Sequence, residues 1–540
     1  MALNIADLFE HAVDAVPDRT AVIAGPRTLT YAQIENEANQ LAHLLQSNGI
    51  GHGDHVGVLA PNTAEHVVAI LALFKIRAVP INLNYRYTAP ELAYVFDNAD
   101  LVGLCFDDSL GPLASQVLTQ REPLRVLVSM GAGIVNNPMP EALAYASARD
   151  EFSTERDFGQ RSPDDLYVLY TGGTTGYPKG VVWRHEDIWR TLGGGTNFMT
   201  GELLDEYDQS TQAATNPPIM AFAVSPLMHG AAVWGTLMHL FSGHTTVLID
   251  KFEAHAVWEL IDRHGVQTVF ITGDAMARPL IEAFDTGRHS GASLAAVASS
   301  AALFSPAVKK RWIDAFSRTV FTDSIGASEV GFTGTTILER DNLAGEGPLV
   351  QMAAQTIVVD DDLNILDPEE HVGQTARVAR AGHIPLGYYN DEEKSRTTFF
   401  ERDGIRFSVP GDYVRIEAGR RLRLLGRGSN CINTGGEKVF AEEVEQALKS
   451  HPNIYDAIVV AVPDPRWGQR VAAVVQARDG LRVTIESIHT HLRTMIAGYK
   501  LPRDITFVDA VPRHVTGKAN YPEARKIMLA SLEPTQQPTH

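Results

Sequence analysis

A glycine- and threonine-rich segment between two apolar runs is the feature of the sequence that most clearly indicates chemistry. It reads Tyr170-Thr-Gly-Gly-Thr-Thr-Gly-Tyr-Pro-Lys-Gly180 and lies between strand-like runs at 166–170 and 181–183. Glycines let backbone N–H groups converge on a phosphate, threonine hydroxyls add donors, and Lys179 adds positive charge. It is not a Walker A loop, because Lys179 follows a proline and precedes a glycine. The segment predicts a phosphate-binding loop, and a plain mobile turn is the alternative.

Taken with later segments, this loop resembles the signature of the adenylate-forming superfamily: acyl-CoA synthetases, peptide-synthetase adenylation domains and beetle luciferases. The motifs follow in the family's order and cover nearly the whole chain. The family's usual loop serine is Gly172 here, which removes one hydroxyl donor and keeps the backbone N–H groups. Within the superfamily the chain is most similar to actinobacterial fatty-acid–CoA ligases. The resemblance implies ATP, Mg²⁺ and CoA as co-substrates.

The resemblance also implies where the nucleotide and the metal ion bind. Ile325-Gly-Ala-Ser-Glu329 is similar to the family's Tyr-Gly-x-Thr-Glu segment, so that Ser328 binds the α-phosphate and Glu329, with Thr174, holds Mg²⁺. This agrees with the preference of Mg²⁺ for a carboxylate together with phosphate oxygens. Outside the motif, Glu329 would be an ordinary surface carboxylate. The residues expected to bind ATP or AMP are Thr171, Gly172, Gly173, Thr174, Thr175, Gly176, Lys179, Ser300, Ala301, Ala302, Ser324, Ile325, Gly326, Ala327, Ser328, Asp412, Arg427 and Lys518.

Two further ionisable residues have specific roles in the family. Gly411-Asp-Tyr-Val414 matches the segment whose aspartate accepts hydrogen bonds from both ribose hydroxyls, and a turn-capping aspartate is the alternative for Asp412. Val511-Pro-Arg-His-Val-Thr-Gly-Lys518 resembles the motif of the catalytic lysine. A lysine there can bridge the attacking carboxylate and the α-phosphate and neutralise charge in the transition state. The alternative for Lys518 is a solvated turn residue.

An acid-binding pocket is implied by Ser225-Pro-Leu-Met-His-Gly230, in which His229 borders the reacting carboxylate. The alternative is a structural histidine, the commoner role for a lone one. Met220–Pro226 contains no acidic residue that could bind an ammonium group, so amino acids are disfavoured as substrates. The expected pocket residues are small or apolar apart from His229, which suits an aliphatic or bulky alicyclic acid, a sterol side-chain acid included. They are His229, Val233, Trp234, Ala298, Gly326 and Gly331. Close core packing would also explain small residues.

The CoA site is expected downstream. Asn433-Thr-Gly-Gly-Glu-Lys-Val-Phe440 looks like the family's CoA-facing turn, in which Gly435 and Gly436 let the pantetheine arm approach the backbone beside Lys438. A strand–turn–helix corner explains the glycines nearly as well. Gly426-Arg427 resembles the start of the family's hinge, and Ser429 stands where relatives pivot on Asp or Lys. A small residue can absorb the backbone change that a hinge needs.

The elements that position these motifs alternate between helix and strand for the first four hundred residues. Helical spacing at 31–48, 64–74 and 254–264 alternates with strand-like runs at 55–59, 245–248 and 268–272. This predicts a layered α/β domain with largely parallel sheets. Strands without intervening helices predict a β-rich subdomain near 340–425. The expected domains are a large N-terminal domain (1–426), a hinge (427–430) and a small mobile α+β C-terminal domain (431–540), with a helix at 485–497.

Composition limits the remaining classes of function. The 540 residues include 46 Lys and Arg against 65 Asp and Glu, a net charge of −19, which argues against nucleic-acid binding. The two cysteines, Cys105 and Cys431, cannot form a zinc site by themselves. The sequence shows neither a signal peptide nor a run of about 20 apolar residues, so we expect a cytoplasmic protein without a transmembrane segment. Peripheral membrane contact and a monomer or homodimer fit this composition.

The expected function is an ATP-dependent carboxylic acid–CoA ligase. The resemblance implies that a fatty or bulky apolar acid is first activated as acyl-AMP and that the acyl group then passes to CoA. Two alternatives stay open: an acyl-AMP-forming enzyme that loads a carrier protein, and a non-catalytic nucleotide-binding relative. The joint presence of Lys179, Glu329, Asp412 and Lys518 argues against the second.

Overall fold

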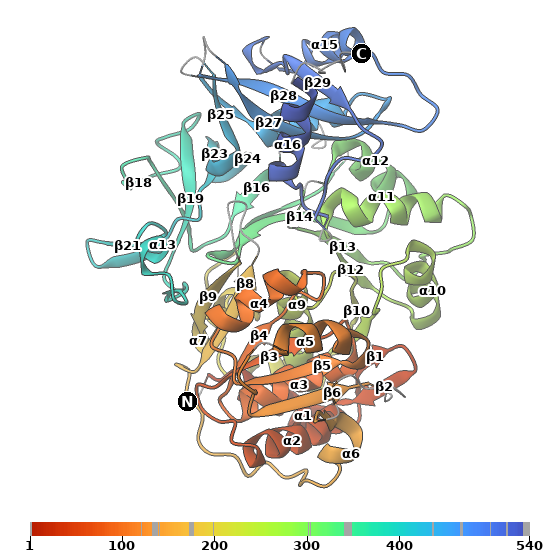
Figure 1. Ribbon diagram of the computed structural model, residues 1–540, viewed down its shortest axis with the longest axis vertical. Helices are drawn as coiled ribbons and strands as arrows, with labels where there is room; N and C mark the ends of the chain where they lie inside the picture. Colours follow the sequence, from red (N-terminus) through yellow and green to blue (C-terminus); the bar gives the residue numbers. More distant parts are fainter. Residues whose placement is uncertain are drawn as a thin grey trace, which may run out of the picture.

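Helices and strands follow one another through the chain in the predicted alternation (Figure 1). The structure is a computed structural model that describes residues 3–119, 121–131, 139, 141–171, 178–197, 199–300, 302, 304–339, 348–434, 437–464, 468–496, 498–514 and 517–532. The helices of the large domain are α1 (Ile5–Ala15), α2 (Tyr31–Ser47), α3 (Ala64–Lys75), α4 (Ala89–Asn98), α5 (Gly111–Leu118), α6 (Tyr145–Arg149), α7 (His185–Leu192), α8 (Asp208–Thr215), α9 (Gly230–Phe241), α10 (Ala254–His264), α11 (Gly273–Phe284), α12 (Pro306–Ala315) and α13 (Glu392–Arg396). None of the described helices has both the length and the apolar character needed to cross a bilayer.

An eight-stranded sheet carries the phosphate-loop candidate near one edge. Its order is β20-β9-β8-β4-β3-β5-β6-β7. The strands are β3 (His55–Leu59), β4 (Val79–Asn82), β5 (Gly103–Asp107), β6 (Val126–Met130), β7 (Leu143–Ala144), β8 (Leu166–Thr171), β9 (Lys179–Arg184) and β20 (Gly387–Tyr388). The central strands pair in parallel and are almost wholly buried, as expected for a sheet covered on both faces. β8 and β9 pair antiparallel, with Thr171 opposite Lys179, so the loop leaves the open end of this hairpin.

A second sheet joins a parallel half to an antiparallel half. β1 (Thr20–Ala24), β11 (Thr245–Leu248), β10 (Met220–Ala223), β12 (Thr268–Ile271), β13 (Ala296–Ser299) and β14 (Val320–Ala327) pair in parallel, and β2 (Arg27–Thr30) closes one edge. Antiparallel pairing then adds β15 (Gly331–Ile337), β16 (Leu349–Met352), β24 (Arg421–Arg427), β23 (Asp412–Glu417), β19 (Thr375–Ala381), β17 (Thr356–Val359), β18 (Ile365–Leu366), β22 (Ile405–Ser408) and β21 (Phe399–Arg402). The predicted β-rich region is this antiparallel half.

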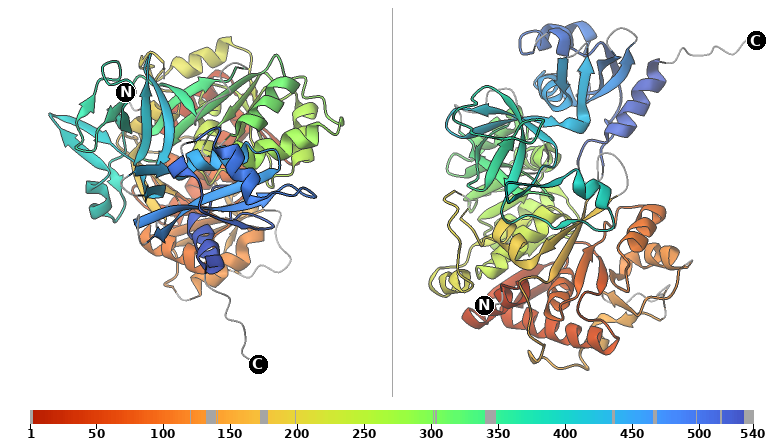
Figure 2. Two further views of the ribbon diagram at one scale, coloured as in Figure 1. Left: turned by 90° about the horizontal axis from the view of Figure 1, so that it is seen from above. Right: turned by 90° about the vertical axis from the view of Figure 1, so that its left-hand side faces the viewer.

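A small C-terminal domain lies over one end of the large one (Figures 1 and 2). Its sheet consists of β25 (Cys431–Thr434), β26 (Glu437–Phe440), β27 (Ile454–Asp464), β28 (Gly468–Ala477) and β29 (Asp504–Phe507). Its helices are α14 (Ala441–Lys449), α15 (Ile485–Leu492) and α16 (Tyr521–Leu532). The chain passes from β24 to β25 through a single helical turn at Gly428–Asn430. The predicted helix at 485–497 was too long, because after Leu492 the backbone forms short-range turn bonds (Thr494 N–H to His491 O, Met495 N–H to Leu492 O).

We expect acid to destabilise the fold, because two histidines, His66 and His185, are buried in the core of the large domain. Burial is the main cause that lowers the pKa of each to about 4. The Ile5 N–H donates to Nδ1 of His185 at 3.4 Å, so a proton on that nitrogen would face a donor. The unfolded chain takes up these protons below the ordinary pKa of about 6.5, whereas the folded chain does so only near 4. Stability is therefore complete above pH 6.5 and falls as the pH is lowered toward 4, by about 2 kcal/mol per histidine at pH 5.

Denaturant titration at pH 7 and pH 5 measures this effect. We expect His185→Gln to lose less stability between the two pH values than the unmodified chain loses. His371→Asn, at a histidine in a turn whose ring contacts the backbone carbonyl of Asp367, is the matched control and should leave the loss unchanged. Equal losses in the unmodified chain and in His185→Gln would contradict the assignment.

Candidate active site

The phosphate-loop lysine is held at the base of the loop by residues far away in the sequence. Lys179 forms an ion pair with Asp391, the residue that caps α13, and its Nζ lies 5.8 Å from the centre of the Tyr388 ring. Asp391 also accepts a hydrogen bond from the Lys394 N–H, which helps to hold its pKa below the usual range. Thr171 ends β8 directly opposite Lys179. The expected ligands Gly172, Gly173, Thr174, Thr175 and Gly176 lie outside the described residues.

Two asparagines that the sequence analysis missed hold the acid-pocket motif against the first sheet, and one of them also bonds to the phosphate-loop hairpin. Asn82, at the end of β4, exchanges hydrogen bonds with the backbone of Tyr170 (2.8 and 3.0 Å) and donates to the Met228 carbonyl at 2.6 Å. Asn62 accepts from the Leu227 N–H at 2.7 Å and donates to the Ser225 carbonyl at 3.1 Å. These bonds fix the segment before His229 relative to β8. Because the partners lie up to 165 residues apart, no local pattern could have revealed them.

The expected metal-binding carboxylate, Glu329, lies in the turn between β14 and β15 of the second sheet and contacts Tyr388 near Lys179. Its Oε1 accepts a hydrogen bond from the Tyr388 hydroxyl at 2.8 Å. Trp183 on β9 donates to the carbonyl of the neighbouring Ser328 at 3.1 Å, which ties the β14–β15 turn to the hairpin. Tyr388 therefore lies between Lys179 and Glu329, a role that sequence reasoning missed. The described residues hold no cluster of three metal-ligating side chains. A single half-buried carboxylate beside a phosphate loop fits Mg²⁺ that arrives with ATP.

The remaining nucleotide candidates line the carboxyl ends of the parallel strands. Ser300 follows β13, and its carbonyl accepts from the Ala302 N–H at 2.9 Å. The Ser324 hydroxyl lies 2.9 Å from that of Thr335, and Ile325 accepts a bond from Thr333. Parallel α/β sheets bind ligands at this end. Of the other nucleotide candidates on these strands, Ala327 is half-buried at the end of β14, and Ala301 lies outside the described residues.

Gly326 and Gly331 are required by close packing between strands. A Cβ atom at Gly326 would lie 2.3 Å from the Gly331 carbonyl oxygen. Gly331 has φ +63°, and a Cβ there would lie 2.1 Å from Thr191 on α7. Gly331 therefore packs against α7, and its expected role as a wall of the acid pocket stays a prediction. Gly326 is exposed at the irregularity between β14 and β15.

The ribose-binding candidate, Asp412, begins β23 and pairs in register with Arg427, the last residue of β24. Both residues lie where the antiparallel half of the sheet meets the small domain. Next to them Tyr413 contacts Phe440 of the small domain, with ring centres 5.6 Å apart. Of the remaining candidates, Gly435 and Gly436 lie outside the described residues, as do the side chains of Arg427, Ser429 and Lys438.

His229 lies at the start of α9 with its Nε2 buried, and that atom has no hydrogen-bond partner among the described residues. Burial, together with the positive charges of Lys518 and Arg86, lowers the pKa of His229 to about 3. The ring is therefore neutral at physiological pH. A buried polar nitrogen without a protein partner fits a site in which a substrate oxygen or water occupies that position.

The expected catalytic lysine, Lys518, belongs to the small domain, yet its positive charge acts on His229 of the large domain. The segment that carries it packs on α11: a Cβ at Gly517 would lie 2.5 Å from that of Ala275. Nearby, Arg278 of α11 is buried and lies 4.9 Å from the centre of the Tyr455 ring on β27. The small domain is thus docked with Lys518 near His229. His229 is linked through the Met228 carbonyl and Asn82 to Tyr170 on β8, and β8 pairs with β9, which begins at Lys179.

The face of α9 that follows His229 borders open space. Ala231 is exposed, and a Cβ added at Gly235 would meet no atom within 4 Å. Below this helix, Phe270 and Ala298 are in register on β12 and β13, and His239 of α9 packs edge-on against Phe270. Val233 and Trp234, which were expected to line the pocket, are buried in the core, with Trp234 edge-on to Tyr167. The open positions on this helix are Ala231 and Gly235.

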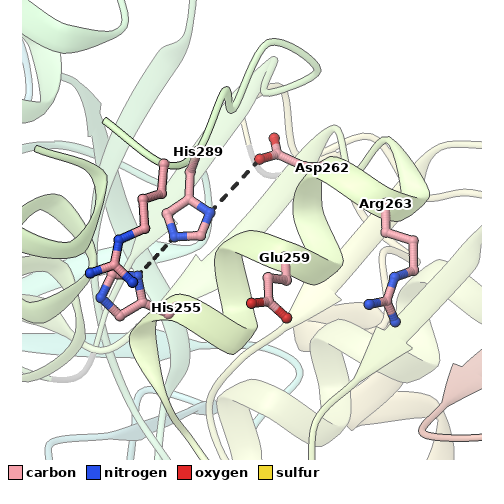
Figure 3. A pocket seen from close by; sticks show the side chains of 6 residues that line it. His255, Glu259, Asp262, Arg263 and His289 are labelled. Carbon is pink, nitrogen blue, oxygen red and sulfur yellow. Dashed lines mark hydrogen bonds and ion pairs between the residues drawn. The ribbon is translucent and has the colours of Figure 1, made fainter. Parts of the chain in front are cut away.

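A separate surface hollow lies on α10, which is away from these residues in the fold (Figures 1 and 3). His255 and His289 face one another across it, with Nδ1 and Nε2 2.8 Å apart, and His289 lies 4.0 Å from Asp262. The imidazoles form a hydrogen-bonded pair in which one ring donates and the other accepts. None of the residues expected in the active site lines this hollow.

Comparison with known proteins agrees with this arrangement. The AMP-binding enzyme family model matches residues 9–389, and the model of the AMP-binding enzyme C-terminal domain matches residues 443–518. The chain is 49% identical to a 3-oxocholest-4-en-26-oate–CoA ligase of Rhodococcus rhodochrous, over 96% of this chain and 95% of the relative. It is 48% identical to a medium/long-chain-fatty-acid–CoA/3-oxocholest-4-en-26-oate–CoA ligase of Mycobacterium tuberculosis, over 97% and 96% of the two chains. The crystal structure of the anthranilate CoA ligase AuaEII with anthranoyl-AMP superposes with a TM-score of 0.83 at 22% identity, over 98% of both chains.

Proposed function

Because the chain belongs to the AMP-binding enzyme family, we propose that it is an ATP-dependent acid–CoA ligase for fatty acids and for a sterol side-chain acid. It is an acid–thiol ligase whose co-substrates are ATP, Mg²⁺ and CoA. The observation that supports the proposal is the electrostatic interaction of Lys518 with His229, in a fold where Tyr388 lies between Lys179 and Glu329. This set of residues suits the activation of a carboxylate by a nucleotide.

The reaction has two steps, and each needs a different environment. In the first, a carboxylate oxygen attacks the α-phosphorus of ATP and pyrophosphate leaves. Lys518 neutralises the charge that develops between carboxylate and phosphate, Lys179 and the loop hold the other phosphates, and Glu329 holds Mg²⁺. In the second step the CoA sulfur attacks the acyl carbonyl, the thiol proton is released and AMP leaves. Neutral His229 borders the carboxylate in the first step without adding a second positive charge.

The two domains divide this work. We propose that residues 1–426 bind ATP and the acid, that 427–430 act as a hinge around Ser429, and that 431–540 carry Lys518 and the CoA-facing turn at Gly435, Gly436 and Lys438. Rotation at the hinge would exchange Lys518 for that turn between the two steps. Asp412 and Arg427 are proposed to bind the nucleotide from the rim of the hinge. Peripheral membrane contact, a monomer or homodimer and a cytoplasmic location stay predictions.

The open face of α9 supports a bulky apolar acid. We propose that the acyl group lies between Ala231 and Gly235 on one side and Phe270 and Ala298 on the other, with its carboxylate at His229. Gly235 adds no side chain to this space, whereas larger residues there would reach toward the sheet. Apolar walls of small residues provide area without polar groups that an acid's hydrocarbon would leave unpaired.

Substitution of Gly235 tests the proposed acyl-binding space between α9 and the strands β12 and β13. We expect Gly235→Leu to lower kcat/KM for 3-oxocholest-4-en-26-oate about 10- to 100-fold, and for octanoate much less, because the ring system needs the filled space. The matched control is Gly159→Leu in an exposed loop before β8, where a Cβ also meets no atom within 4 Å and the backbone is not left-handed. Equal losses for both acids would place the acyl group elsewhere.

Acid-dependent exchange between ATP and labelled pyrophosphate, run without CoA, tests the activity itself. The chain should catalyse exchange with dodecanoate or 3-oxocholest-4-en-26-oate and not with ATP alone. Absence of exchange with every acid tried would contradict the proposal and favour a non-catalytic nucleotide-binding protein.

A further inference from the structure

The segment that carries Lys518 is folded into a tight turn by one arginine. Arg513 pairs with Ala519 in a backbone bridge, and the His514 N–H donates to the Lys518 carbonyl at 2.8 Å. Inside the turn, Nη1 of Arg513 donates to the Gly517 carbonyl at 2.8 Å. Gly517 has φ +82°, in the left-handed region, so the chain reverses direction immediately before the lysine. The turn is thus closed across its base by the arginine side chain.

The rest of the Arg513 guanidinium is fixed by a carboxylate on β27, an edge strand of the small-domain sheet. Nε and Nη2 donate to the two oxygens of Asp456 at 2.5 and 2.7 Å, a bidentate geometry that sets the plane of the guanidinium. Asp456 is also 3.3 Å from Lys449, whose side chain is only 5% exposed. These two cations hold the pKa of Asp456 at about 2 although the carboxyl is largely buried. The Asp456 carboxylate therefore stays ionised throughout the working pH range.

On its other side the turn rests on the large domain. A Cβ at Gly517 would overlap Ala275 on α11, so the backbone next to Lys518 lies directly against that helix. Arg513 holds the carbonyl of this same glycine. A single residue thus connects the lysine turn, the sheet of the small domain and the surface on which that domain docks.

We infer that Arg513, anchored by Asp456, is a positioning residue that holds Lys518 in the orientation needed to activate the acid. The inference rests on the proposed role of Lys518 in the adenylating step. A lysine at 513 could form one ion pair but could not provide three donors in one plane. Loss of the Arg513 clamp, the bonds from Arg513 to Asp456 and to the Gly517 carbonyl, would leave Lys518 present and charged but able to point in other directions. Misplacement of a reacting group by about 1 Å can cost about 100-fold in rate.

Separate measurement of the two steps tests this inference. With dodecanoate as the acid, Arg513→Ala is expected to lower kcat for acid-dependent ATP–pyrophosphate exchange about 10- to 100-fold. Thioester formation from synthetic dodecanoyl-AMP and CoA, which does not need Lys518, should change less than about threefold. Asp456→Asn keeps the size of the anchor and removes its charge, and should give a smaller loss in the same step. A general folding defect would instead reduce both steps together.

A matched control and a double variant decide the cause. Arg470 makes the same type of clamp in the same domain, with a 2.6 Å bond to Asp504 and a 2.7 Å bond to the Pro463 carbonyl, and it does not contact the lysine turn. Arg470→Ala should leave exchange unchanged. In a Lys518→Ala background, Arg513→Ala should cause no further loss of exchange, because the group that it positions is gone.

The outcomes separate this inference from the proposed function. If Lys518→Ala slows exchange but Arg513→Ala does not, or if the two losses multiply, the clamp inference is overturned while the role of the lysine stands. If Lys518→Ala itself leaves exchange unchanged, the proposed role of the lysine fails first. Equal slowing by Arg470→Ala and Arg513→Ala would assign the effect to the stability of the domain.

Discussion

Lys518→Ala should lower the rate of acyl-adenylate formation about 10²- to 10³-fold, the largest effect of any single substitution in the chain. The lysine neutralises negative charge that grows as the carboxylate approaches the α-phosphate, a charge that Lys179 and Mg²⁺ at the other phosphates compensate only in part. The same variant should convert synthetic acyl-AMP and CoA to product at nearly the normal rate. Pyrophosphate exchange and thioester formation, each followed on its own, measure the two rates.

Lys526→Ala is the control for this experiment. Lys526 lies on the helix that follows Lys518 in the same domain, and its side chain is 78% exposed. Removing it changes the net charge of the domain by the same amount and should leave both steps unchanged. The account would be contradicted if Lys518→Ala formed acyl-AMP normally and lost only the thioester step, because the lysine would then serve CoA.

Glu329→Gln should have the second largest effect, about 10²-fold or more on kcat/KM for MgATP. Glutamine keeps an oxygen that can accept the bond from the Tyr388 hydroxyl, so the local geometry is preserved while the negative charge is lost. Mg²⁺ prefers charged oxygen ligands, so the variant should need a higher Mg²⁺ concentration for half-maximal rate. Initial rates measured over a range of Mg²⁺ at fixed ATP give this value.

Tyr388→Phe separates charge from orientation at the same carboxylate. It removes the hydroxyl that donates to Glu329 and keeps the ring beside Lys179. Partners that orient a metal ligand are usually worth about 10- to 100-fold, so we expect a loss near the lower end of that range and smaller than that of Glu329→Gln. A normal Mg²⁺ requirement in Glu329→Gln would show that this carboxylate does not hold the metal ion.

Local patterns were sufficient to predict the elements that carry the motifs. The helix at 254–264 and the strand at 245–248 have the predicted limits, because alternation and helical spacing are properties of neighbouring residues. The two strands on either side of the phosphate loop, and a β-rich region near 340–425, also follow from such patterns. The roles of His229 and Lys518, which the family resemblance implied, stay predictions, and the positive charge of Lys518 acts on His229.

Residues that act through distant partners could not be predicted in this way. Asn82 bonds to backbone atoms 88 and 146 residues away, and Tyr388 reaches Glu329 across 59 residues. Side-chain directions were out of reach for the same reason. A Cβ at Gly331 would point at Thr191 on α7, a contact that only the fold reveals. Trp234 lies on the buried face of α9, whereas Gly235 lies on the face that borders the open space.

Mass spectrometry of the products formed from MgATP, CoA and a mixture of carboxylic acids tests the central claim most directly. The mixture should contain short to long fatty acids, an aromatic acid and 3-oxocholest-4-en-26-oate. The account predicts acyl-CoA together with an equal amount of AMP, formed from long-chain or sterol acids and not from the aromatic acid. Acyl-AMP that accumulates without any CoA thioester would contradict the account and favour transfer to a carrier protein.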